Sequence, residues 1–223
     1  MIQREKLATA QVPGGAELTL YRHDRDHMIV LGDNELMSTR KWGSEEALAT
    51  MAFDKIGNDK QPSMLIGGYG MGFTLRAALK VLPADGHVTV VELVPEIIDW
   101  ARGTMAELTA GCLEDPRVTL VMSDVAPFIA GGHADYDAIL LDVDNGPDGL
   151  VREDNNILYS TPGLRAARRA LTADGVLAIW SAGPDPTFTR RLERCDFVVD
   201  EVKVPSRSNG KGPKHVIWFA RKR

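Results

Sequence analysis

A glycine-rich turn between an apolar strand and a helix constrains the fold of this chain more than any other feature. Residues 64–72 read Met-Leu-Ile-Gly-Gly-Tyr-Gly-Met-Gly, a helical pattern follows over 73–82, and the apolar run 88–92 ends in Glu92. Glycine lets the backbone turn sharply and approach a ligand closely, because it has no Cβ. A carboxylate at the tip of the next strand can accept hydrogen bonds from both hydroxyls of a ribose. The pattern therefore predicts a nucleoside site on a strand–loop–helix–strand unit.

Two nucleoside cofactors fit this pattern, a nicotinamide dinucleotide and S-adenosylmethionine. The dinucleotide fingerprint requires glycine at its first, third and sixth places, and the sixth place counted from Gly68 is Phe73. Gly68, Gly70 and Gly72 occupy the first, third and fifth places instead, which resembles motif I of the class I S-adenosylmethionine-dependent transferases. A glycine turn that only packs a helix onto a sheet is the alternative without a ligand.

The bulk properties indicate a single cytoplasmic protein. A length of 223 residues suffices for one substantial α/β core with a small appendage. The net charge of −5 argues against a broad nucleic-acid-binding surface. Cys112 and Cys195 lie far apart without a metal-ligand pattern, so we expect a reducing compartment and no metal. No secretory signal or membrane-length apolar run is visible, and we expect no membrane partner.

The first sixty residues predict a small separate domain. Three short strands form an expected antiparallel meander, at residues 17–22, 27–31 and 35–39. A helix over 44–53 follows, with Ser44 as a plausible N-cap. The polar stretch 57–62 is the expected linker. We therefore predict one domain over residues 1–60 and a nucleoside-binding domain over residues 61–223.

In the second domain, strand-like and helix-like segments alternate. The apolar runs that predict strands are 64–66, 88–92, 118–122, 138–141 and 176–180. The helix-like segments between them are 73–82, 95–109, 126–130 and 161–171. Such alternation predicts a parallel sheet with helices on both faces. Segments 197–204 and 215–220 predict a closing hairpin. The expected α/β fold is therefore a doubly wound, mostly parallel seven-stranded sheet with a terminal antiparallel hairpin, as in class I methyltransferase-like proteins.

Ligands of open parallel sheets bind beyond the carboxyl ends of the strands, and four candidates lie there. The glycine loop follows the first strand, and Glu92 ends the second. Asp124 follows the third strand, where it would accept a hydrogen bond from an adenine amino group, cap the helix that begins at Val125, or do both. Asp142 follows the fourth strand and either forms a turn or faces the substrate.

Several spaced motifs in one order resemble the spermidine synthase (polyamine aminopropyltransferase) family. They are Ile-Gly-Gly at 66–68, Val-Glu-Leu-x-Pro-Glu at 91–96, Asp-Pro-Arg-Val at 115–118, Asp124, and Tyr-Asp-x-Ile-x-x-Asp at 136–142. Leu-Tyr-Ser-Thr at 158–161 and Leu-Thr-Ala-Asp-Gly-Val at 171–176 continue the match. The resemblance covers about residues 60–182, and the flanking β-domain and closing strands agree with it in kind.

By position, this resemblance implies that Glu92 binds ribose, Asp124 recognises adenine, and Asp142 helps to deprotonate an attacking amine. Deprotonation leaves a lone pair that can displace at the carbon next to a sulfonium, and this reaction needs no metal. The resemblance also implies a small-molecule amine substrate and a homodimer. The other implied cofactor-binding residues are Gly67, Gly68, Gly70, Gly72 and Val125, and the candidate substrate-binding residues are Asp144, Asn145 and Tyr159.

The chain also departs from the family pattern. The family loop carries an aspartate after three glycines, whereas the loop 67–72 has no acid, and the second family aspartate is Asn145 here. The family's Gln-x-Thr and Tyr-His-Glu segments are replaced at 36–39 and 43–46. The missing loop acid removes a counter-ion for an aminopropyl ammonium, and also a charge that would repel the carboxylate of intact S-adenosylmethionine.

These departures leave several functions open. The first is an alkyl transferase that aminopropylates a small amine from decarboxylated S-adenosylmethionine and releases methylthioadenosine. The second is a methyltransferase that uses intact S-adenosylmethionine on a small amine. The third is a nucleoside-binding protein that has lost catalysis, and a dinucleotide-dependent oxidoreductase comes last because the sixth glycine is absent.

Overall fold

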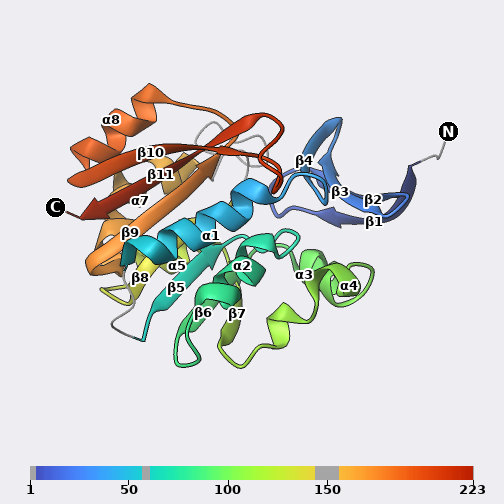
Figure 1. Ribbon diagram of the computed structural model, residues 1–223, viewed down its shortest axis with the longest axis horizontal. Coiled ribbons are helices and arrows are strands. Elements are labelled where there is room, and N and C mark those ends of the chain that lie inside the picture. The colour runs from blue at the N-terminus through green and yellow to red at the C-terminus, as the bar shows by residue number, and fades with distance from the viewer. Residues whose placement is uncertain (1–3, 57–60, 144–155, 223) are drawn as a thin grey trace.

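Two sheets of different size organise the chain. The computed structural model describes residues 4–56, 61–143 and 156–222. A four-stranded antiparallel sheet comes first, and a seven-stranded sheet flanked by helices follows. In Figure 1 the small sheet lies at one end of the molecule, near the N-terminus, and the C-terminus lies at the other end.

The small sheet contains one strand more than the sequence predicts. Its strands pair in chain order, and they are β1 (Glu5–Gln11), β2 (Glu17–His23), β3 (Asp26–Leu31) and β4 (Asn34–Ser38). The predicted antiparallel meander corresponds to β2, β3 and β4. The additional strand β1 has Ala10 as its one buried residue, so its sequence carries little of the apolar alternation that marks a half-buried strand.

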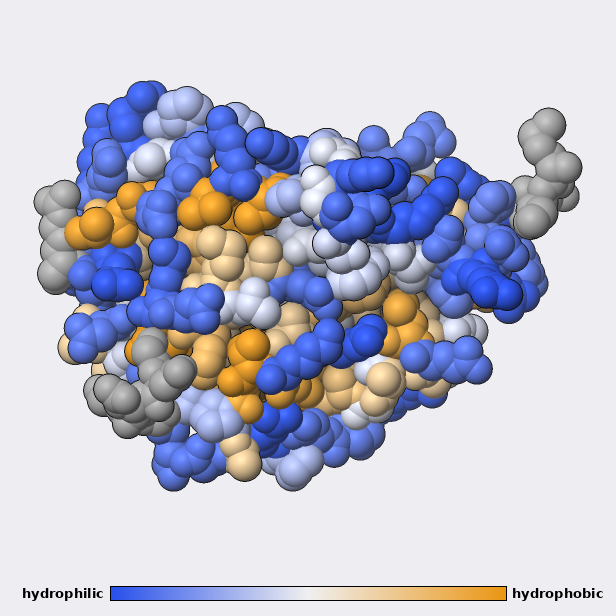
Figure 2. All heavy atoms as spheres, in the orientation of Figure 1, coloured by the Kyte–Doolittle hydropathy of each residue, from blue (hydrophilic) through white to orange (hydrophobic). Residues whose placement is uncertain are grey.

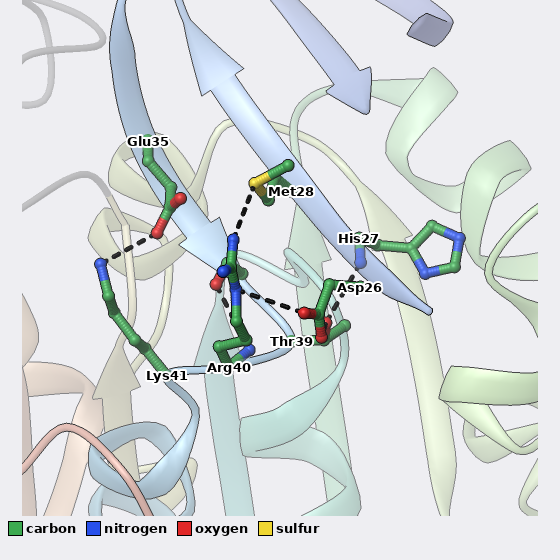
Figure 3. A network of polar contacts seen from close by, with 8 residues as sticks. Asp26, His27, Met28, Glu35, Thr39, Arg40 and Lys41 are labelled. Carbon is green, nitrogen blue, oxygen red and sulfur yellow. Dashed lines mark hydrogen bonds and ion pairs between the residues drawn. The ribbon is translucent and has the colours of Figure 1, made fainter. Parts of the chain in front are cut away.

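A polar network holds the segment that leaves the small sheet (Figure 3). Thr39 Oγ1 donates a hydrogen bond of 2.8 Å to Asp26 Oδ1, and Arg40 Nε lies 3.3 Å from Asp26 Oδ2. Lys41 Nζ lies 2.9 Å from Glu35 Oε1. Partly exposed ion pairs of this kind contribute little free energy each. Together they fix the position from which the chain enters its first helix.

The large sheet confirms the predicted doubly wound fold. Its strand order is β10-β11-β9-β8-β5-β6-β7. The five strands from β9 to β7 are parallel, and β10 and β11 form the expected antiparallel hairpin against β9. The strands are β5 (Ser63–Gly67), β6 (His87–Glu92), β7 (Val118–Met122), β8 (Tyr136–Leu141), β9 (Leu171–Ser181), β10 (Phe197–Pro205) and β11 (Lys214–Lys222).

Helices cover both faces of the large sheet. They are α1 (Gly43–Ile56), α2 (Phe73–Val81), α3 (Pro95–Arg102), α4 (Ala106–Thr109), α5 (Val125–Ala130), α6 (Asn156–Tyr159), α7 (Thr161–Ala170) and α8 (Pro186–Arg194), with a 3₁₀ turn at Cys112–Glu114. Side chains of α1, α2 and α3 share one hydrophobic core with the small sheet. Side chains of α5, α7 and α8 form the core on the other face. The small sheet is thereby joined to the α1–α2 side of the molecule.

Two helical predictions differ from the structure, and two helices were not predicted. The helix expected over 95–109 is two helices, because the backbone leaves helical geometry at Gly103, where φ is −108° and ψ is −103°. The helix expected over 161–171 ends at Ala170, and Leu171 already pairs with Tyr136 as the first residue of β9. Helices α6 and α8 were not predicted.

The surface of the described residues exposes few large hydrophobic side chains. On the face in Figure 2, hydrophobic residues form a band across the middle, with polar residues on both sides. Large hydrophobic side chains that are clearly exposed are Met122, Ile157 and Val198. Within the described ranges, no helix combines the length and hydrophobicity that crossing a membrane requires. Helix α1 packs against α2 and β9, and the predicted domain boundary at residue 60 stays a prediction.

Candidate functional site

A cavity opens at the carboxyl ends of the parallel strands, where the fold predicts a ligand site. Its volume is about 840 Å³ when the open solvent at its mouth is included. The large sheet contributes predicted site residues to its wall, namely Gly68, Gly70, Glu92, Asp124, Val125 and Asp142. The small sheet contributes apolar side chains, namely Leu18, Ile29, Leu36 and Met37, and Val12 between β1 and β2 joins them.

The glycine loop is shaped by its neighbours inside the protein. Gly68 has a φ of +86°, and a Cβ there would lie 2.7 Å from the carbonyl oxygen of Asp142. Gly70 has a φ of +55°, and a Cβ there would lie 2.6 Å from Sδ and Cε of Met37. Both conformations favour glycine. Gly67 faces Val125 at similarly close range, since a Cβ would meet its Cγ2 at 2.8 Å.

Glu92 joins the glycine loop to the turn before α3. Its Oε2 accepts a hydrogen bond of 2.8 Å from the Tyr69 amide, and its Oε1 accepts one of 2.8 Å from the Val94 amide. The side chain is buried, and burial raises the pKa of Glu92 although these amides act to lower it. Each carboxylate oxygen has a further lone pair, so Glu92 can serve the backbone and a ligand at the cavity wall together.

Asp124 caps helix α5, as one of its two predicted roles requires. Its Oδ1 accepts a hydrogen bond of 2.9 Å from the Ala126 amide. Asp124 and Val125 also line the cavity. The cap is therefore confirmed, while the contact between Asp124 and adenine stays a prediction.

Asp142 lies directly after β8 with its side chain on the cavity wall. Its Oδ2 accepts a short hydrogen bond of 2.6 Å from Thr74 Oγ1 in the first turn of α2. Burial raises the pKa of Asp142 to about 6, against the lowering effect of this hydrogen bond. A carboxyl with such a pKa is mostly ionised at neutral pH and can still take up a proton, which suits a general base.

The three candidate substrate residues have different outcomes. Asp144 and Asn145 lie outside the described residues. Tyr159 is buried, and its hydroxyl donates a hydrogen bond of 3.1 Å to the carbonyl oxygen of Val143. Tyr159 therefore holds the residue that follows Asp142, and its contact with a substrate stays a prediction.

Sequence reasoning missed two polar residues near Asp142. Thr74 is one, because a threonine early in a helix gives no signal of a partner 68 positions away. Glu45 is the other, and its carboxyl is buried on α1. An acid in the first turn of a helix is ordinary on the surface, where it complements the helix dipole, so the sequence does not reveal its burial.

The sheet order and the cavity at its carboxyl edge define an α/β protein with the class I methyltransferase-like fold. A family model described as the spermine/spermidine synthase domain matches residues 43–191, more than half of the chain. The chain belongs to this family, as the motifs predicted.

Curated relatives have names of two kinds. The polyamine aminopropyltransferase of Mycobacterium tuberculosis H37Rv is 33% identical over 135 residues, which are 59% of this chain and 25% of that protein. Polyamine aminopropyltransferase 1 of Streptomyces coelicolor is 30% identical over 194 residues, 82% of this chain and 34% of that protein. Putrescine N-methyltransferase 2 of Nicotiana attenuata is 34% identical over 133 residues, 59% of this chain and 33% of that protein. The chain thus spans about a quarter to a third of these relatives.

Solved structures share the fold over nearly the whole chain. A spermidine synthase in complex with the transition state analogue AdoDATO has a TM-score of 0.79 at 19% identity, covering 98% of this chain and 74% of that one. The spermidine synthase of Thermotoga maritima has a TM-score of 0.75 at 19% identity, covering 98% and 72%. Both cover the small sheet as well as the large one.

Proposed function

We propose that the protein is an aminopropyltransferase that acts on a small amine. It would use decarboxylated S-adenosylmethionine as co-substrate and release methylthioadenosine. Asp142 carries the proposal, because it places a carboxylate with a pKa of about 6 on the wall of the cavity. Membership of the spermine/spermidine synthase domain family and the aminopropyltransferase names of the bacterial relatives support it.

The cavity residues suit the two halves of this chemistry. Glu92 offers carboxylate lone pairs at the end of β6 for ribose hydroxyls, and Asp124 lies at the end of β7 for the adenine. Asp142 takes a proton from the attacking ammonium, since a protonated amine has no lone pair to donate. The freed lone pair forms the new bond to carbon while the bond from carbon to sulfur breaks, and the sulfur keeps that electron pair as a neutral thioether.

Methyl transfer from intact S-adenosylmethionine is the second candidate, and Gly70 favours it. The family acid of the glycine loop is absent, and the side chain that faces Gly70 is the apolar Met37. Met37 supplies no charge at this point to hold an aminopropyl ammonium or to repel a carboxylate. Relatives from Nicotiana are named putrescine N-methyltransferases. A nucleoside-binding protein without catalysis is the remaining alternative.

Product analysis separates these candidates. Purified protein is incubated with putrescine and either sulfonium compound, and the nucleoside products are identified by mass spectrometry. Aminopropyl transfer yields methylthioadenosine, and methyl transfer yields S-adenosylhomocysteine. Binding of methylthioadenosine without either reaction would indicate a non-catalytic protein. The Asp142→Asn variant is the control, because it removes the proposed base and retains the shape of the side chain.

We also propose that the enzyme is a cytoplasmic homodimer, as the sequence and the family resemblance led us to expect. Light scattering coupled to size-exclusion chromatography gives the mass in solution. A mass of one chain would contradict the dimer.

A further inference from the structure

Tyr69 is a large aromatic residue in the middle of the glycine loop. It stands between Gly68 and Gly70, which both line the cavity. These two glycines have positive φ, so the chain bends sharply on either side of Tyr69. The Tyr69 side chain is nevertheless buried. It therefore packs inside the protein while its neighbours face the cavity.

The ring of Tyr69 folds back under the loop that carries it. A Cβ on Gly72 would lie 2.7 Å from Tyr69 Oη and 2.9 Å from its Cζ, so the tip of the ring lies against the residue that precedes α2. The Gly72 amide also donates a hydrogen bond of 2.9 Å to the Tyr69 carbonyl oxygen. The ring and the backbone of Tyr69 together support the turn into α2.

The hydroxyl of Tyr69 contacts a cysteine that lies 43 positions further along the chain. Tyr69 Oη and Cys112 Sγ lie 3.4 Å apart, within the range of a hydrogen bond to sulfur. Burial is the main cause that raises the pKa of both groups. Both therefore keep their proton at neutral pH, and either can donate to the other.

Cys112 belongs to a segment that is held by the neighbouring helices. It is buried and begins the 3₁₀ turn that follows α4. Just before it, Thr109 Oγ1 donates a hydrogen bond of 2.9 Å to the carbonyl oxygen of Ala101 in α3. Arg76 Nη1 in α2 donates one of 2.7 Å to the carbonyl oxygen of Leu108. The cysteine is therefore a fixed point against which the glycine loop can be held.

The backbone of Tyr69 connects this fixed point to Glu92. The Tyr69 amide donates to Glu92 Oε2, and the Val94 amide, at the start of α3, donates to Oε1, each at 2.8 Å. The segment of Cys112 is bonded to the same helix α3. The contacts thus form a closed circuit that runs from the Tyr69 hydroxyl through α3 to Val94 and returns through Glu92.

We infer that Tyr69 is a positioning residue for the nucleoside, whose hydroxyl contact with Cys112 holds the carboxylate of Glu92 in the orientation that ribose binding requires. The inference rests on the proposed function, which places the ribose at Glu92. Binding groups are effective only when neighbouring contacts hold them close to the productive geometry. Loss of the Tyr69 hydroxyl should therefore weaken nucleoside binding and leave proton removal at Asp142 in place.

Two variants that each remove one side of the contact test this role. Tyr69→Phe removes only the hydroxyl, and Cys112→Ala removes the thiol. Calorimetric titration should show that each binds methylthioadenosine about three- to tenfold more weakly than the parent. The double variant should bind no more weakly than the single variants, because all three lose the same contact. In turnover with putrescine, KM for decarboxylated S-adenosylmethionine should rise while kcat stays near the parental value, which is the pattern of lost uniform binding.

A second pair of variants asks whether Tyr69 acts through Glu92. Glu92→Ala has no carboxylate to position, so the addition of Tyr69→Phe should not weaken methylthioadenosine binding further. Tyr136→Phe is the matched control, because Tyr136 begins β8 at the end of the strand opposite to Asp142. This control should bind methylthioadenosine like the parent.

The outcomes separate the inference from the proposed function. A Tyr69→Phe variant that melts at a lower temperature but binds methylthioadenosine as tightly as the parent would show a purely structural residue and overturn the inference. An effect of Tyr69→Phe that persists in full beside Glu92→Ala would overturn it as well. If the affinities change as expected but no aminopropyl transfer occurs, the inference stands and the proposed function fails. A parent that binds no methylthioadenosine would overturn both.

Discussion

The substitution Glu92→Gln tests the double role of the acid at the end of β6. In the parent, the two carboxylate oxygens accept hydrogen bonds from the amides of Tyr69 and Val94. A glutamine keeps one oxygen acceptor and puts an NH₂ group against the other amide. One of these two buried N–H groups must then lose its partner, whichever way the side-chain amide is turned.

The size of the effect follows from the number of donors left unpaired. One buried unpaired donor costs about 1–3 kcal/mol. For a chain of this size, about 2–4 °C of melting temperature corresponds to each kcal/mol, so we expect a decrease of roughly 2–12 °C. Glu92→Ala leaves both amides unpaired and should cost about twice as much. Loss of a charged acceptor for ribose should also weaken methylthioadenosine binding by about one to two decades.

Thermal unfolding and calorimetric titration with methylthioadenosine measure the two effects on the same samples. Glu107→Gln is the matched control, because it changes the net charge by the same amount at an exposed position of α4. A Glu92→Gln variant that unfolds and binds like the parent would refute the reasoning on both counts. A variant that loses stability but binds normally would refute the ribose contact alone.

Three further predictions concern the reacting end of the cavity. Asp142→Asn should leave methylthioadenosine binding intact and lower turnover by about 10²-fold or more. In the parent, kcat/KM for the amine should rise as pH passes about 6, because Asp142 ionises there. The pKa of Asp142 is higher in the folded protein, about 6, than the value of 3.8 expected in the unfolded chain. The contribution of this carboxyl to the free energy of unfolding is therefore fully present below pH 3.8 and is lost as pH rises through about 6. Unfolding of the parent and of the Asn variant, measured as a function of pH, can show this. Thr74→Val removes the hydrogen bond that lowers this pKa, and the rise in kcat/KM should move to higher pH. Intact and decarboxylated S-adenosylmethionine should bind the parent within about tenfold of each other, while Gly70→Asp combined with Met37→Ala should favour the decarboxylated form. A parental preference of about a thousandfold would contradict this last expectation.

The fold could be predicted from the sequence where apolar runs are buried on both faces. The strands expected over 88–92 and 138–141 are buried and lie in β6 and β8, and the glycine loop leads into α2 at Phe73 as expected. Strand β1 was not predicted because Ala10 is its one buried residue. Helix α8 was not predicted, although Asp185 caps it and Pro186 is its first residue. These two residues together are a recognised signal for the start of a helix.

Only those site residues that lie at the ends of strands could be predicted from the sequence. Glu92, Asp124 and Asp142 follow parallel strands, so they were expected at one edge of the sheet, and all three line the cavity. Thr74 and Glu45 interact with Asp142 through the packing of α1 and α2 against the sheet. Long-range packing of this kind leaves no spacing pattern in the sequence.

The origin of the cavity walls has a consequence for how ligand choice can change. The acids at the cavity wall come from the large sheet, while residues 12–37 contribute part of the apolar lining, namely Val12, Leu18, Ile29, Leu36 and Met37. The size and polarity of the cavity therefore depend in part on a different stretch of the chain from the acids themselves. Variation in the small sheet can alter which sulfonium compound fits and leave the proton-accepting group in place.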